Sequence, residues 1–307
     1  MRDTPLPQPS VAGSIAPSDL VVRLPRHEAS YWGDAVRRLR RNKLAVLGAV
    51  LVAVIMLLAV GADILTPYPY AKASFSHAYE SPNPRYPLGT DPLGRDLLSR
   101  MIYGARISMI VGVGSQVLVV LIGVPIGALA GYHGGKLDLY LMRAVDVMYA
   151  FPTLLFVILI MSALGAGLLN IFIAIGVTGW VTLCRLTRGQ ILALREQEFV
   201  IGARAAGATS WQVILRHLLP NALAPIIVAV TFGVPRAIFT EAALSFIGVG
   251  INPPLPSWGG MVGEYQTYLR SYWYMATFPA VAIGLTMLAF SFLGDGMRDA
   301  LDPTLKR

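Results

Sequence analysis

The stretch Ile107–Tyr132 reads ISMIVGVGSQVLVVLIGVPIGALAGY and contains no charged side chain. A helix rises 1.5 Å per residue, so about 20 apolar residues cross the roughly 30 Å hydrocarbon core of a bilayer. In water, a helix of this composition would leave apolar side chains exposed on every face. The stretch therefore predicts a membrane-spanning helix, and with it an all-α membrane protein.

Five other stretches meet the same length requirement. The six predicted spans are 44–65, 107–132, 141–163, 168–184, 221–249 and 274–294. Only the small-residue turn Leu164–Gly167 separates the third span from the fourth. Joining these two would leave five spans, but the joined helix would be about twice the length that a bilayer needs. We therefore expect six spans.

Basic residues predict the orientation of these spans, because cytoplasmic segments carry an excess of Lys and Arg. Segments 1–43, 133–143, 185–217 and 295–307 hold 18 Lys or Arg, and the segments on the opposite side hold 6. The strongest single anchor is the run RRLRRNK at 37–43, which adjoins the first span. Both ends of the chain are therefore expected in the cytoplasm.

Composition supports a membrane protein. The chain has 307 residues, of which 14% are charged and 55% hydrophobic, and its mean hydropathy is +0.60. The net charge of +8 does not indicate nucleic-acid binding, because the basic residues flank apolar blocks. The single cysteine, Cys184, excludes an intramolecular disulfide and is expected to be a packing residue. Residues 1–34 are expected to form a disordered tail, and 35–307 the transmembrane domain.

The chain lacks the motifs of several catalytic classes. It has no G-x-x-x-x-G-K-[ST] for ATP and no H-E-x-x-H for a metal. All four histidines lie outside the spans or at their ends. The sequence therefore predicts neither enzyme activity, nor a cofactor, nor a metal site.

Two charged residues, Arg236 and Glu241, lie well inside a predicted span. Charges at such depth are costly and are often functional. Five residues separate the two along the helix, which places them about 140° apart around it. They are candidates either for structural pairing with neighbouring helices or for lining a translocation path. So few deep charges weaken the case for a stand-alone carrier.

The cytoplasmic loop 185–220 is too long to be a simple connector. Its pattern predicts a helix, a break at Gly207 and a second amphipathic helix that ends at Pro220. The small residues Ala203, Ala205, Ala206 and Gly207 would let another backbone approach closely. Docking of a protein and a helix lying on the bilayer surface both fit these features.

This loop resembles the EAA loop of ABC-importer permeases, in which E-A-A is followed at fixed spacing by Gly, Ile and Leu-Pro. Gly207 and Leu219-Pro220 match that spacing, whereas Ile201, Gly202 and His217 depart from the pattern. The resemblance implies a loop that couples the chain to ATPase subunits. The residues it assigns to coupling are Phe199, Ala203, Arg204, Ala205, Ala206, Gly207, Trp211, Leu219 and Pro220.

Other stretches resemble one branch of these permeases, the C-type subunit of dipeptide and oligopeptide importers. Before the second span, LGTDPLGRDLLSR at 88–100 is similar to that branch and includes Asp91, Gly94, Arg95 and Asp96. The outer loop around Trp258 and the segment 293–303 are similar as well. The match spans roughly residues 35–307.

The resemblance implies the six-helix fold of type I ABC-importer permeases in a bacterial or archaeal cell membrane. The implied partners are a second homologous permease, two ATP-binding cassette subunits, an extracytoplasmic peptide-binding protein and membrane lipid, with no nucleic acid. The implied cargo is dipeptides and oligopeptides. Nickel or another small solute is the main alternative on the same architecture, and a stand-alone channel or carrier is a remote one.

Overall fold

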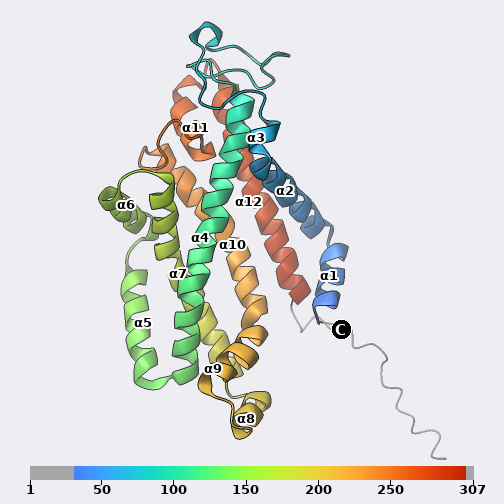
Figure 1. The fold of residues 1–307 in the computed structure, drawn as a ribbon, viewed down its shortest axis with the longest axis vertical. Helices are drawn as coiled ribbons and strands as arrows, with labels where there is room; N and C mark the ends of the chain where they lie inside the picture. Colours follow the sequence, from blue (N-terminus) through green and yellow to red (C-terminus); the bar gives the residue numbers. More distant parts are fainter. Residues whose placement is uncertain (1–30, 302–307) are drawn as a thin grey trace, which may run out of the picture.

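The computed structural model describes residues 31–301, and within this range it contains helices but no β-strand. The bundle is formed by five long helices (Figure 1): α2 Lys43–Val60, α4 Leu97–His133, α7 Leu168–Leu194, α10 Leu219–Phe246 and α12 Trp273–Leu301. One end of the bundle carries α3 Ala62–Leu65, α11 Trp258–Tyr265 and the loops beside them. The other end carries α8 Glu198–Ala205 and α9 Ser210–Gln212.

Within residues 31–301, five helices are long and apolar enough to cross a membrane, and the third predicted span is broken. In place of one helix over 141–163, the chain forms α5 Gly135–Ala150 and α6 Thr153–Leu164, bent by 87°. The break lies at Phe151-Pro152, where Phe151 is extended, with φ −82° and ψ 132°. A residue before proline is pushed out of the helical region, so the helix ends there. The third and fourth spans are nevertheless separate, as predicted, because Gly165 and Gly167 turn the chain between α6 and α7.

Several helices extend beyond their apolar stretches. The second predicted span, 107–132, lies within α4, which begins ten residues earlier at Leu97. Asp96 caps this helix by accepting a hydrogen bond from the backbone N–H of Ser99. The fourth predicted span, 168–184, continues as α7 to Leu194. The bundle is therefore longer than the apolar layer that sequence hydropathy defines.

Pro220 does not end a helix, contrary to the prediction. One continuous helix runs from Ser210 to Phe246. The turn before the proline, Val213–Leu218, is a π-helix in which Leu219 donates its N–H to Ile214 O. In this wider turn the backbone hydrogen bonds run to the carbonyl five residues back. The helix can therefore continue through Pro220, which has no N–H to donate.

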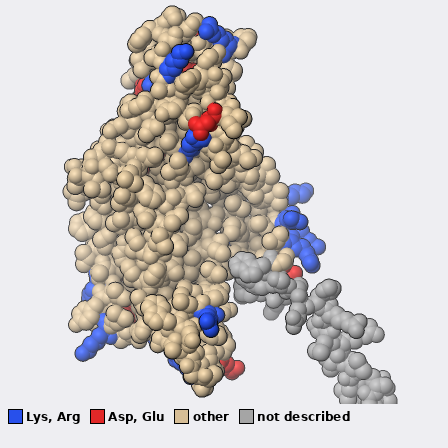
Figure 2. Space-filling model, in the orientation of Figure 1, with Lys and Arg blue, Asp and Glu red and all other residues tan. Residues whose placement is uncertain are grey.

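The helix α1 Tyr31–Arg41 precedes the first span. It includes residues 31–34, which were expected to belong to the disordered tail, and residues 1–30 lie outside the described part of the chain. Asn42 separates α1 from α2 and accepts hydrogen bonds from the N–H groups of Leu44 and Ala45. Figure 2 shows basic side chains gathered beside α1 and at the two ends of the molecule, with few charges between them on this face. That distribution fits a bilayer around the middle of the bundle.

The helices α4 and α7 pack against each other through a row of glycines. A Cβ built on Gly127 would lie 2.4 Å from Cys184 O. Cβ atoms built on Gly123 and Gly131 would each lie 2.8 Å from a carbonyl oxygen of α7, that of Trp180 and that of Arg188 respectively. Small residues four apart allow this close approach of membrane helices. Cys184 is fully buried in this contact, as expected of a packing residue.

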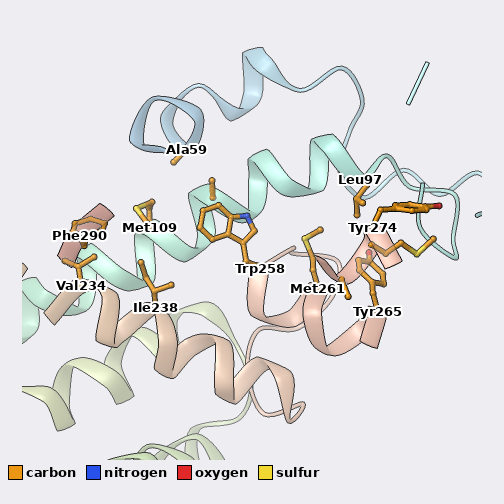
Figure 3. Close-up of a cluster of buried hydrophobic side chains, with 13 residues drawn as sticks. Ala59, Leu97, Met109, Val234, Ile238, Trp258, Met261, Tyr265, Tyr274 and Phe290 are labelled. Carbon is orange, nitrogen blue, oxygen red and sulfur yellow. The ribbon is translucent and has the colours of Figure 1, made fainter. Parts of the chain in front are cut away.

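The half of the bundle next to α11, called the outer half below, is held by a cluster of buried side chains from α2, α4, α10, α11 and α12 (Figure 3). At its centre the Trp258 indole N–H donates to Met101 O at 3.0 Å. A Cβ on Gly104 would lie 2.8 Å from the same indole ring. Trp258 thus fixes α11 to the outer part of α4, which positions the outer loops.

Candidate functional site

The end of the molecule that is expected to face the cytoplasm is a pair of short helices, α8 and α9, joined by a glycine turn. The helix α8 ends at Ala205, and Gly207 takes φ +86°, a backbone conformation that favours glycine. Gly207 donates its N–H to Arg204 O at 2.9 Å, and Ala208 donates to Ala203 O at 3.0 Å. Thr209 then begins α9 with a reciprocal capping box to Gln212. The predicted break at Gly207 is therefore present, with helices on both sides.

This helix pair has a buried side and an exposed apolar side. Val200, Val213, Ile214 and Leu218 are buried in a common cluster. Four large apolar side chains are exposed here: Phe199 (43%) and Ile201 (55%) on α8, Trp211 (60%) on α9, and Leu215 (57%) in the π-turn that follows α9. Because the buried side anchors the helices, the exposed side forms a fixed apolar surface at the tip of the molecule.

The structure places the nine coupling residues predicted from the sequence in two groups. Seven lie in or between α8 and α9: Phe199, Ala203, Arg204, Ala205, Ala206, Gly207 and Trp211. Arg204 also stacks its guanidinium over the Tyr132 ring, 5.2 Å from the centroid, which ties α8 to the end of α4. Leu219 and Pro220 lie about 12 Å further along the helix that contains Trp211.

At the other end of the molecule, Asp91 and Arg95 form a buried ion pair. Arg95 Nε donates to Asp91 Oδ2, and Asp91 Oδ1 accepts from the backbone N–H groups of Leu93 and Arg95 at 2.9 and 2.8 Å. Both side chains are nearly inaccessible: that of Arg95 is 6% exposed and that of Asp91 is 0% exposed. Gly94 takes φ +68° in the turn between them, and a Cβ there would lie 1.9 Å from Ser74 O. The turn thus brings Arg95 back onto Asp91.

The helix α11 completes this group of side chains, called the outer cluster below, which consists of Asp91, Arg95, Arg100, Glu264 and Tyr265. Arg95 Nη2 and Arg100 Nη2 both donate to the Glu264 carboxylate, the latter at 3.1 Å, and the Tyr265 hydroxyl donates to Asp91 Oδ2 at 2.9 Å. Burial by itself lowers the pKa of Arg95, but Tyr265, Asp91 and Glu264 together raise it above its ordinary value. Burial raises the pKa of the Tyr265 hydroxyl well above its usual range. Sequence reasoning missed Glu264 and Tyr265, although a lone acid in the apolar run WGGMVGEY was a usable signal.

The two deep charges, Arg236 and Glu241, occupy different environments. Arg236 lines a cavity of about 570 Å³ bounded by α4, α7, α10 and the α5–α6 break. Glu241 is fully buried, accepts a hydrogen bond from Ser245 on its own helix at 2.7 Å, and does not line that cavity. The two side chains therefore do not share one environment, although they lie five residues apart on α10. Among the described residues, no group of three His, Cys, Asp or Glu is placed to hold a metal ion.

Two models of known protein families match two separate stretches of this chain. Residues 123–307 match the family described as the binding-protein-dependent transport system inner membrane component. Residues 30–82 match the N-terminal TM domain of oligopeptide transport permease C. The chain is also similar in fold to a solved structure of the MetNI methionine ABC transporter in an inward-facing conformation. That comparison has a TM-score of 0.55 at 20% identity and covers 67% of this chain and 98% of the other.

Three curated relatives extend over nearly the whole chain. The oligopeptide transport system permease protein OppC of Bacillus subtilis is 42% identical over 93% of both chains. The dipeptide permease protein DppC of the same organism is 44% identical over 92% of this chain and 88% of its own length. The glutathione permease protein GsiD of Pectobacterium atrosepticum is 38% identical over 90% and 92%. The chain therefore belongs to the family of inner membrane components of binding-protein-dependent transport systems, as a multi-pass permease subunit of an ABC importer and not as the subunit that hydrolyses ATP.

Proposed function

We propose that this chain forms half of the translocation pathway of an ATP-driven importer of dipeptides and oligopeptides in a bacterial or archaeal cell membrane. The other half is a second homologous permease. Two ATP-binding cassette subunits hydrolyse ATP on the cytoplasmic side, and a peptide-binding protein delivers cargo on the outside. Similarity to OppC and DppC over nearly the full length supports this cargo class.

The exposed apolar surface of α8 and α9 is the observation that carries the coupling role. Exposed aromatic side chains such as Phe199 and Trp211 are typical anchors of protein interfaces. The helix α9 is continuous with α10, so a force on Trp211 would reach the membrane interior through one rigid element. We propose that the nine residues identified above form this contact, with Leu219 and Pro220 transmitting the movement.

The second part of the proposal concerns the outer loops around this cluster. Asp91, Gly94, Arg95, Asp96 and Trp258 hold the outer loops in a defined shape. We propose that this shaped surface receives the loaded peptide-binding protein. It lies at the end of the bundle opposite α8 and α9, which is the end that the basic residues predict to face outward.

Nickel is the alternative cargo that the sequence left open. The described residues contain no cluster of metal-binding side chains, and the two relatives most like this chain among those named above are peptide permeases. Peptide cargo is therefore favoured. A stand-alone carrier would leave the exposed α8–α9 surface without a role.

Uptake by the reconstituted complex tests this proposal. Proteoliposomes that contain both permeases and both ATPases receive the binding protein outside and ATP inside. We expect ATP-dependent accumulation of labelled trialanine and no accumulation of radioactive nickel. Accumulation of nickel in place of the peptide, or uptake by the chain without its ATPases, would contradict the proposal.

A further inference from the structure

The cavity beside Arg236 has the size and lining of a ligand site. Its volume of about 570 Å³ lies within the range of small-molecule pockets, roughly 300–1,000 Å³. Tyr149, Phe151 and Pro152 from the α5–α6 break supply one wall, and residues of α4, α7 and α10 supply the others. It therefore lies where the bent third span meets the long helices.

Arg236 is the only charged side chain among the described residues that line this cavity. Within residues 31–301 its guanidinium has no hydrogen-bond, ion-pair or aromatic partner, and the Thr240 hydroxyl on the next turn donates only to the Arg236 carbonyl. A cation at membrane depth is costly unless it faces water or an opposite charge. Glu241 does not supply that charge, because it is buried against Ser245 on another side of the helix.

Gln116 adds a second unpartnered polar group to the same wall. It is 7% exposed, lines the cavity and has no hydrogen-bond partner among the described residues. Its amide lies over Gly233, where a Cβ would come within 2.0 Å of Gln116 Oε1. Gly233 is one turn before Arg236 on α10, so the amide packs against the same stretch of helix that carries Arg236, and both side chains line the cavity. Together they supply the cavity with one cation and one group that both donates and accepts hydrogen bonds.

We infer that this cavity binds the C-terminal end of a peptide during translocation, with Arg236 holding the terminal carboxylate and Gln116 a peptide bond. The inference rests on the proposed function and assigns a part of that pathway. A guanidinium binds a carboxylate through two parallel hydrogen bonds, and an amide matches a peptide bond in donor and acceptor. Both groups recognise features that all peptides share, so the site accepts any side-chain sequence.

The test compares two probes, labelled trialanine with a free carboxylate and trialanine with a C-terminal amide. Each is supplied at a concentration that saturates the binding protein, as checked on the isolated binding protein. The variants are Arg236→Gln, Arg236→Lys, which keeps the charge, and Arg143→Gln. Arg143 is exposed on α5 and does not line the cavity, so its variant is the matched control.

We expect wild-type complex to transport the acid faster than the amide. Arg236→Gln should slow uptake of the acid roughly tenfold to a hundredfold, the range for losing a hydrogen bond to a charged group, and bring the two probes to equal rates. Arg236→Lys should retain part of the preference, and Arg143→Gln all of it.

Three results would overturn the assignment: unchanged uptake in Arg236→Gln, an equal loss for both probes, or loss of the second permease from the purified complex. The last would mean that Arg236 pairs with that subunit. Failure of the wild-type complex to transport either probe would instead refute the proposed function itself.

Discussion

Replacing Trp211 with alanine is expected to weaken binding of the ATPase subunits by at least roughly 30-fold, the effect of removing an interface residue worth 2 kcal/mol or more. Trp211 is 60% exposed on α9, at the tip of the molecule. Its ring is the largest apolar group on the α8–α9 surface, and the capping box of Thr209 and Gln212 holds the helix that presents it. Because the ring is exposed, its loss should not destabilise the permease itself.

Trp273 provides the matched control for this prediction. It is the same residue type, is 58% exposed and lies at the opposite end of the bundle, at the start of α12. Trp273→Ala should leave ATPase association unchanged. The measurement is titration of purified ATPase subunits onto permease in nanodiscs. Equal affinity of the Trp211→Ala and Trp273→Ala variants would show that the tip is not the docking surface.

Replacing Arg95 with glutamine is expected to destabilise the outer loops by roughly 3 kcal/mol, because removing one partner of a buried ion pair leaves the other charge uncompensated. Asp91, with a side-chain exposure of 0%, would keep its backbone donors, the Tyr265 hydroxyl and the more distant Arg100, whose Nε lies 3.7 Å from Asp91 Oδ2. We place the effect at the low end of the usual range because Glu264 is 39% exposed and keeps its bond to Arg100.

Arg85 is a control from the same loop. Its side chain is exposed and lies over the Tyr86 ring, 5.4 Å from the centroid, so Arg85→Gln should cost at most about 0.5 kcal/mol. Thermal unfolding in detergent and protease cleavage of the outer loops would measure both variants. If Arg95→Gln and Arg85→Gln behave alike, the buried cluster does not hold the loops together.

The positions of the membrane helices could be predicted from the sequence, but their ends could not. Apolar length indicates where a helix crosses lipid, so each predicted span coincides with a helix or with the broken pair α5 and α6. The helix α4 nevertheless begins at Leu97, because Asp96 caps it there, and α7 continues to Leu194 beyond the apolar run. Helix ends depend on capping groups and not on the surrounding solvent.

Two prolines show why local sequence was insufficient. Phe151-Pro152 breaks a span that was predicted to be continuous, whereas Pro220 sits in a helix that it was predicted to end. At Pro220 the π-turn Val213–Leu218 accommodates the missing N–H, and at Pro152 the preceding residue is extended. Nothing in the residues next to either proline distinguishes these outcomes.

The outer cluster was predicted only in part for a related reason. Its motif residues Asp91 and Arg95 are near neighbours in the sequence, but Glu264 lies 169 residues from Arg95 and Tyr265 lies 174 from Asp91. Only the folded chain brings α11 against the turn at Gly94. Helical periodicity placed Arg236 and Glu241 on different sides of a helix, but it could not predict that Arg236 alone of the two lines the cavity.

The most direct test of coupling through α8 and α9 is a cross-link from a single introduced cysteine. The native Cys184 is fully buried, so a thiol at Ala206→Cys, which is exposed beside Gly207, would be the accessible one among the described residues. In membranes containing the whole complex, a short thiol-to-amine reagent should join this cysteine to an ATPase subunit, with a yield that changes on adding ATP. Ser271→Cys, exposed in the outer loop, should give no such product. Absence of the adduct from Ala206→Cys, or its appearance from Ser271→Cys, would contradict the account.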